Sequence, residues 1–378
     1  MTDKLFIASG IFHPESGGPA TYLYELLPAL QQRNWSVDVL TYGDAPTVDY
    51  PYPIKRIPRR ILPLRLLDYW RHARPCIAQA DLIYAHTLDL PLSAGTAPRL
   101  IKIVGDAAWE RSIRRAWIPA TTDIDSFQTQ DYGWLAQRQK QSRSRQVKAF
   151  DGVIVPSQYL KQMVCQWGMP EKHVTVIYNA LPPLPAPMPE SQLAAREALK
   201  WGAYPTLLTA ARLNPWKGID HLIHAIEKIS DVRLIIAGDG SDRIRLEQIA
   251  QPLGDRVQFM GHVSRERLYQ MMQAADYFAL YSGYEGLPHT ALEALRVGTP
   301  VIASDKGGNP EVIRHKENGF LVPYVDVDAL TDTLKMAFAS DTRDRLAAQT
   351  AHGMEQFTFD FMVSQTDKTL RQYLPSNA

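Results

Sequence analysis

The sequence lacks several features that would place it in a simple class. It contains 2 cysteines among 378 residues, Cys76 and Cys165, and they match no metal-binding or redox spacing. A buried thiol is expected for each, as in a reducing compartment. No apolar run approaches the ~18 residues that a membrane span needs, and the first residues lead into a predicted strand without the layout of a signal peptide. We therefore expect a cytoplasmic protein.

The sequence also lacks a strong net charge. The formal charge is +1, and no known nucleic-acid-binding module is present, so we expect no nucleic-acid partner. Residues 1–185 carry 21 Lys/Arg and 16 Asp/Glu, whereas residues 186–378 carry 20 and 24. Much of the basic excess lies in residues 55–74, which also contain leucines and aromatic residues. Such a segment is typical of a solvated helix face or of contact with an anionic membrane, and both readings stay open.

The length of the chain exceeds what one hydrophobic core usually serves, so two domains are expected. Short apolar runs alternate with helical stretches, which predicts parallel, doubly wound α/β sheets. Five prolines between Leu181 and Pro189 exclude a helix or a central strand and indicate a stiff connector. The predicted organisation is a first domain over 1–181, a linker over 182–189, a second domain over 190–355 and a last helix within 356–378.

One stretch organises the second half. An apolar strand over Tyr277 to Leu280 leads into a Gly/Pro loop, an Ala/Leu-rich helix and a second buried strand. Pro288 suits the first turn of the helix and Gly298 suits its end. Glu285 lies in the loop after the strand, where open α/β sheets bind ligands, and Glu293 lies one to two turns into the helix.

This E-x7-E pattern, followed by Gly-Thr-Pro-Val-Ile-Ala-Ser over 298–304, resembles the retaining glycosyltransferases of family 4. The resemblance implies the GT-B architecture, in which two Rossmann-like domains face a cleft and the C-terminal helix crosses back to the first domain.

Other motifs extend the resemblance. Arg212 and Lys217 follow a strand over Thr206 to Ala210, and two cations at this place suit a diphosphate. Gly17 and Gly18 lie between the first strand and a helix, without the GxGxxG spacing of a dinucleotide dehydrogenase. They match the family's Gly-Gly loop, which faces the donor diphosphate.

The resemblance assigns the following roles. Arg212 and Lys217 neutralise the leaving diphosphate, Glu293 binds ribose hydroxyls, and Glu285 holds hydroxyls of the donor sugar. The backbone of Gly286, Leu287 and Pro288 lies near the sugar and phosphate. The remaining donor-site candidates are Gly17, Gly18, Gly238, His262 and Val263. No DxD metal motif is evident, and we expect neither a metal nor another cofactor.

The sequence departs from the family pattern at Gly105-Asp106, where many relatives place a histidine near the reacting sugar carbon. Asp106 is a candidate catalytic residue here, and a helix N-cap with Glu110 in the first turn is a compatible reading. His13 and His86 follow or end strands, and each is expected to be a hydrogen-bonded structural histidine. We expect a Gln/Arg-rich helix over 128–150 to shape the acceptor site.

The function that follows is hexosyl transfer from a UDP- or GDP-sugar to a sugar or lipid-linked acceptor, with retention and in polysaccharide or glycolipid biosynthesis. Two alternatives stay open: a nucleotide-sugar 2-epimerase of the same architecture, and a catalytically silent nucleotide-sugar binder.

Overall fold

The computed structural model describes residues 2–15, 17–45, 49–92, 95–119, 122–181, 183–185, 187–339 and 341–375. The chain forms two compact units. The first comprises residues 1–117, 131–179 and 359–378, and the second comprises residues 118–130 and 180–358. The first unit is therefore assembled from segments on both sides of the second in the sequence.

The first unit contains a seven-stranded sheet in the order β3-β2-β1-β4-β5-β6-β7, with every pairing parallel. Most central strand positions are fully buried, as expected for a parallel sheet covered on both faces. The strands are β1 (Asp3–Ser9), β2 (Trp35–Tyr42), β3 (Ile54–Ile57), β4 (Leu82–Ala85), β5 (Arg99–Lys102), β6 (Gly152–Val155) and β7 (Val174–Val176).

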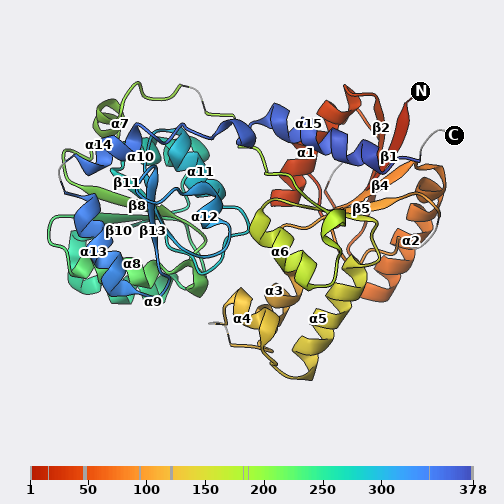
Figure 1. Ribbon diagram of the computed structural model, residues 1–378, viewed down its shortest axis with the longest axis horizontal. Helices are drawn as coiled ribbons and strands as arrows, with labels where there is room; N and C mark the ends of the chain where they lie inside the picture. Colours follow the sequence, from red (N-terminus) through yellow and green to blue (C-terminus); the bar gives the residue numbers. More distant parts are fainter. Residues whose placement is uncertain are drawn as a thin grey trace. The chain divides into compact units, whose positions relative to one another are not determined.

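The helices of this unit begin at recognisable sequence signals. Asp106 caps one helix and Ser157 caps another, each through its side-chain oxygen. The last helix packs beside α1 (Figure 1), and its Asp367 accepts a hydrogen bond from the indole N–H of Trp35 at 2.7 Å. The helices are α1 (Gly18–Gln31), α2 (Leu62–Gln79), α3 (Ala107–Arg114), α5 (Trp134–Val147), α6 (Gln158–Gln166) and α15 (Phe359–Gln372), with a 3₁₀ turn over Glu171–His173.

The second unit contains a six-stranded parallel sheet in the order β10-β9-β8-β11-β12-β13. Its strands are β8 (Thr206–Ala210), β9 (Arg233–Ala237), β10 (Val257–Gly261), β11 (Tyr277–Leu280), β12 (Val301–Ser304) and β13 (Gly319–Val322). The helices are α4 (Ile124–Thr129), α7 (Gln192–Leu199), α8 (Ile219–Glu227), α9 (Arg243–Ala250), α10 (Arg265–Ala274), α11 (His289–Arg296), α12 (Asn309–Val312), α13 (Val327–Ala337) and α14 (Thr342–Ala347). Three 3₁₀ segments cover Pro215–Lys217, Gln251–Arg256 and Glu355–Phe357.

The structure confirms the predicted fold class of two parallel α/β units and the crossing of the last helix to the first. It differs in the expected helix over 128–150, which is interrupted between Thr129 and Trp134. Gly133 adopts φ +92° there, and its N–H donates to the carboxylate of Asp131, so the backbone turns instead of continuing a helix.

The segment 118–130 groups with the second unit, whereas the sequence placed all of 1–181 in the first domain. Asp123 lies close to Tyr324 of the second unit, where burial, aided by acidic neighbours including Asp123, raises the pKa of the tyrosine to about 12. No sequence pattern indicates that residues 118–130 group with the second unit.

Candidate functional site

The predicted site residues of the second half lie in loops at the carboxyl ends of the second sheet's strands. Arg212 and Lys217 follow β8, Gly238 follows β9, and Glu285 follows β11. His262 and Val263 come directly after β10. Because the strands are parallel, these loops all emerge at one edge of the sheet, which is where open α/β sheets bind ligands.

The central contact of this edge is an ion pair between Lys217 and Glu285. The Lys217 Nζ lies 2.7 Å from the Glu285 Oε1, and the two side chains are 18% and 15% exposed. The N–H of Gly283 donates to the carbonyl of Trp216 at 2.7 Å and links the two loops. Arg212 lies nearby in sequence but is exposed, and its guanidinium makes no hydrogen bond or ion pair within the described part of the chain.

The loop that carries Glu285 rests on the backbone of the loop after β12. The N–H of Gly308 donates to the Glu285 carbonyl at 2.8 Å. Gly307 has φ +61°, and a Cβ there would lie 2.4 Å from that carbonyl oxygen. A side chain is therefore excluded at 307 by both conformation and space. No pattern in the sequence indicated that this loop supports Glu285.

Gly238 also occupies a place that only glycine fits. Its φ is +120°, and a Cβ would lie 2.0 Å from the carbonyl oxygen of Ala211. Its N–H donates to the Gly261 carbonyl at 2.7 Å. These contacts hold the loop after β9 between the loops that carry Arg212 and His262. His262 is exposed and Val263 is half-buried.

Glu293 lies in the second turn of α11, as the sequence predicted. Its carboxylate accepts a hydrogen bond from the Tyr269 hydroxyl at 3.0 Å, and the Arg296 guanidinium donates to the same hydroxyl. Burial raises the pKa of Glu293, while the Tyr269 hydrogen bond and the charges of Arg265 and Arg296 act in the opposite direction. The carboxylate is thus desolvated and held in a fixed orientation.

The N-terminus of α11 is preceded by the predicted loop of Gly286, Leu287 and Pro288. Leu287 and Pro288 are buried, and Pro288 occupies the N-cap position without a side-chain cap hydrogen bond. A helix N-terminus of this kind presents backbone N–H groups and a partial positive charge. Glu285 and Lys217 therefore stand beside an edge that favours anions.

Asp106, the candidate at the departure from the family pattern, is fully buried in the first unit. Its Oδ1 accepts from the N–H groups of Ala108 and Trp109, which confirms the N-cap reading. Its Oδ2 forms an ion pair with Arg143, whose guanidinium lies 4.1 Å from the centre of the Trp167 ring. Both carboxylate oxygens of Asp106 thus already have partners.

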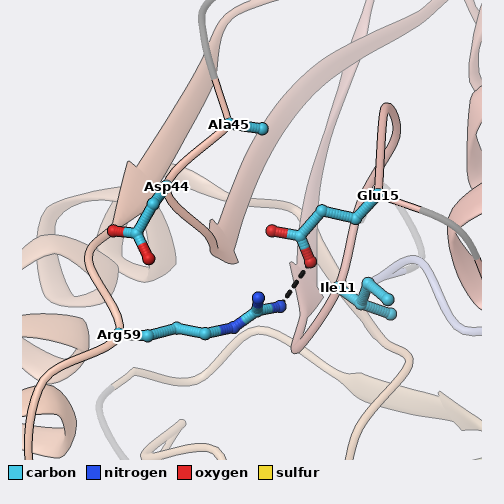
Figure 2. A pocket seen from close by; sticks show the side chains of 5 residues that line it. All are labelled: Ile11, Glu15, Asp44, Ala45 and Arg59. Carbon is cyan, nitrogen blue, oxygen red and sulfur yellow. Dashed lines mark hydrogen bonds and ion pairs between the residues drawn. The ribbon is translucent and has the colours of Figure 1, made fainter.

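A hollow of about 510 Å³ lies at the carboxyl edge of the first sheet. It is lined by residues from the loops after β1, β2 and β3, namely Ile11, Glu15, Asp44, Ala45 and Arg59. Figure 2 shows Arg59 reaching across to pair with the Glu15 carboxylate, with the Asp44 carboxylate nearby. The hollow is a polar surface suited to hydroxyl groups.

Gly17 and Gly18 lie close to this edge, at the start of α1. Gly17 is half-buried, Gly18 is exposed, and no atom of other residues lies within 4 Å of where a Gly18 Cβ would be. His13 is a satisfied structural histidine, as predicted: its Nδ1 lies 3.0 Å from the Tyr50 hydroxyl and its ring stacks on Tyr24.

Sequence reasoning missed three residues around Glu293, namely Tyr269, Arg265 and Arg296. Arg265 and Tyr269 lie on α10, the helix before the E-x7-E unit, and Arg296 lies on α11, one turn after Glu293. Among the described residues no three His, Cys, Asp or Glu side chains gather as a group that could hold a metal ion.

Two family models match the chain along most of its length. "Glycosyltransferase Family 4" matches residues 16–183 and "Glycosyl transferases group 1" matches residues 192–352. A GDP-mannose-dependent alpha-(1-6)-phosphatidylinositol monomannoside mannosyltransferase of Mycobacterium tuberculosis is 32% identical over 185 residues, which cover 46% of this chain and 48% of the relative. The chain spans about half the length of the curated relatives that it matches.

Solved structures agree with the fold. Sucrose-phosphate synthase from Thermosynechococcus elongatus superposes with a TM-score of 0.77 at 23% identity, covering 98% of this chain and 99% of that one. HepE of Anabaena, solved with UDP and glucose, gives a TM-score of 0.73 at 20% identity over 98% and 100%. With the two matching models, this likeness shows that the chain belongs to the family 4-like glycosyltransferases of the GT-B fold.

Proposed function

We propose that the chain transfers a hexosyl group from a UDP- or GDP-sugar to a sugar or lipid-linked acceptor, with retention at the anomeric carbon. The observation that carries the proposal is the Lys217–Glu285 pair, set at the carboxyl edge of the second sheet beside the N-terminus of α11. A lysine paired with a carboxylate that binds sugar hydroxyls is well placed to exchange that partner for a diphosphate.

In this proposal Lys217 moves from Glu285 to the donor diphosphate when the donor binds. Arg212, whose side chain is exposed, supplies the second cation, and its planar fork binds two phosphate oxygens. Glu285, released from Lys217, then accepts hydrogen bonds from hydroxyls of the donor sugar. The N–H groups of Gly286 and Leu287 and the helix N-terminus stabilise the leaving phosphate as its charge develops.

Glu293 is proposed to bind the ribose hydroxyls, because a desolvated carboxylate held by Tyr269 accepts two hydrogen bonds in a fixed direction. Gly238, His262 and Val263 are proposed to contact the base, and Gly17 and Gly18 the diphosphate. We propose that no metal is required, because two cations and a helix N-terminus provide the positive charge. Asp106 is proposed to position α3 rather than to contact substrate.

The donor-binding part of the proposal is tested by thermal stabilisation against UDP-, GDP- and ADP-sugars, with and without magnesium. A selective stabilisation that persists in EDTA and that Glu293→Ala removes is the expected result. Stabilisation only with magnesium would contradict metal independence, and no stabilisation by any nucleotide sugar would contradict the donor site itself.

Two further activities are compatible with such a site, a nucleotide-sugar 2-epimerase and a silent nucleotide-sugar binder. Product formation separates them from a transferase. A transferase consumes the donor only when an acceptor is present and yields an α-linked product from an α-linked donor, whereas an epimerase converts the donor without acceptor. A silent binder is stabilised by the donor but yields neither product.

A peripheral membrane contact is the second part of the proposal. The start of α2 exposes Ile61, Leu62, Leu64 and Leu67, at 71%, 56%, 47% and 42% of their surface, next to the exposed Arg59 and Arg60. Exposed apolar side chains next to arginines suit an anionic bilayer surface. Within the described residues no helix has the length and apolar character to cross a bilayer.

A further inference from the structure

A polar cluster lies at the carboxyl end of the first sheet and takes no part in the proposed donor site. Lys102 is the last residue of β5, and His86 follows the last residue of β4. Ala85 pairs with Ile101 in the parallel register, so His86 and Lys102 come next to each other where these strands end. Tyr22 of α1 and Tyr84 of β4 complete the cluster.

Lys102 is buried, and among the described residues it forms no ion pair. Lys102 is 4% exposed, and its Nζ lies 3.8 Å from the centre of the Tyr22 ring. Within the described residues the Nζ has no well-aligned hydrogen-bond partner, and Tyr22 is the neighbour that favours its charge. An ammonium group has three donors, and leaving them unmet away from water is strongly unfavourable.

His86, next to Lys102, is also a buried residue with a nitrogen that has no partner among the described residues. The residue is 9% exposed, its ring centre lies 4.4 Å from that of Tyr84 and 5.5 Å from that of Tyr22, and its Nε2 has no partner among the described residues. The expectation of a fully hydrogen-bonded histidine is therefore wrong for this nitrogen. Two unmet nitrogen groups thus lie together at an edge where parallel sheets bind ligands.

The pKa shifts of Lys102 and His86 indicate that the cluster lacks a negative charge. Burial lowers the pKa of Lys102, and burial together with the positive charge of Lys102 lowers that of His86 well below its usual range. The Tyr22 hydroxyl acts in the opposite direction on Lys102, and among the described residues no carboxylate is a cause of either pKa shift. A bound anion would supply the absent negative charge and accept hydrogen bonds from the Lys102 Nζ and from the His86 tautomer that carries its proton on Nε2.

A purely structural role explains less of this arrangement. The contact of Lys102 with the Tyr22 ring satisfies one side of the ammonium, and the Tyr22 and Tyr84 hydroxyls, 3.4 Å apart, pair with each other. A methionine at 102 would fill the same space and contact the same ring without an unmet charge. The presence of a lysine here therefore favours a ligand over packing.

We propose that Lys102 and His86 bind an anionic group, a phosphate or a carboxylate, carried by the acceptor. That the anion belongs to an acceptor rests on the proposed function, but anion binding at the cluster can be measured independently of that function. The acceptor class implied is a phosphorylated or acidic sugar rather than a neutral one.

The test is isothermal titration calorimetry of the full chain with inorganic phosphate and with acetate. Lys102→Met and His86→Gln remove the two nitrogen partners, and Lys172→Met is the matched control because Lys172 is an exposed lysine of the same unit. We expect saturable binding to the unaltered chain and to Lys172→Met, and at least tenfold weaker binding to both cluster variants. Glucose 6-phosphate, glucuronate and glucose then distinguish a phosphate from a carboxylate source.

Thermal unfolding of the same variants gives the second readout. An anion-binding lysine is unmet in the free protein, so Lys102→Met should unfold at the same temperature or higher. A lower unfolding temperature for Lys102→Met, undiminished anion binding by it, or no saturable binding of phosphate or acetate to the unaltered chain would overturn the proposal. Stabilisation by nucleotide sugars is measured in parallel, so that failure of the donor site is recognised separately.

Discussion

Lys217 and Glu285 are 68 residues apart in the sequence, yet the lysine Nζ lies 2.7 Å from the carboxylate Oε1. Sequence reasoning assigned the lysine to a diphosphate and the glutamate to a sugar, but gave no indication that they pair with each other. The pair neutralises both charges and holds the two side chains in place.

Replacing Lys217 by Met should abolish most turnover while leaving the fold intact. Loss of a preorganised charge at a leaving group lowers kcat by about 10²–10³-fold. The assay is donor consumption with acceptor present, and Lys228→Met serves as the control because Lys228 pairs with Asp328 on the exposed surface of the same unit. Full activity of Lys217→Met would refute the role given to this lysine.

Replacing Glu293 by Gln should weaken donor binding and change the pH dependence of stability. Burial raises the folded-state pKa of Glu293 above that of the unfolded chain. The folded state therefore binds this proton more tightly, and the stability from that proton is full below the unfolded pKa and falls as pH rises through the folded pKa. The Gln variant lacks this loss. In urea unfolding, its stability relative to the unaltered chain should therefore be higher at pH 7.5 than at pH 4.

Donor affinity is the companion measurement for Glu293→Gln. Hydrogen bonds to a charged group contribute about 1.5–3 kcal/mol each, so we expect nucleotide affinity to fall at least tenfold. A variant that binds the donor normally but shows the pH effect would assign Glu293 to structure alone.

Replacing Asp106 by Ala should unfold the first unit at a much lower denaturant concentration. The change removes an N-cap and takes from the buried Arg143 the carboxylate with which it forms an ion pair, which together destabilise by about 3–5 kcal/mol. Asp123→Ala is the matched control, because Asp123 caps α4 through the Ser126 N–H in an exposed setting and its loss amounts to only about 1 kcal/mol. Equal effects of the two substitutions in urea titrations would contradict the buried pairing.

Replacing Leu62 and Leu64 together by Glu should weaken binding to vesicles that contain phosphatidylglycerol by more than tenfold, since it removes apolar contact and adds repulsive charge. Vesicle flotation measures it. Leu193→Glu is the control, because Leu193 is 67% exposed on α7 of the second unit. Binding that is insensitive to the double substitution, or absent from the unaltered chain, would exclude this surface as the contact.

The sequence predicted the parts of the fold that depend on local pattern. The strands Thr206–Ala210 and Tyr277–Leu280 were predicted with the bounds that the structure gives, because apolar runs delimit them. Contacts between distant segments could not be predicted from the sequence. No pattern indicates that Tyr269 contacts Glu293, or that His86 Nε2 has no partner among the described residues. The break near Gly133 depends on one positive φ, which periodicity does not reveal.

The ion pair between Asp3 and Arg371, at 3.0 Å, joins residues on either side of the second unit. The second unit is thus an insertion within the first, and a chain emerging from the ribosome has made all of the second unit before α15 is available. Until then the strands β1 and β2 lack their contacts with that helix. During synthesis the second unit can therefore reach its folded state before the first unit is complete.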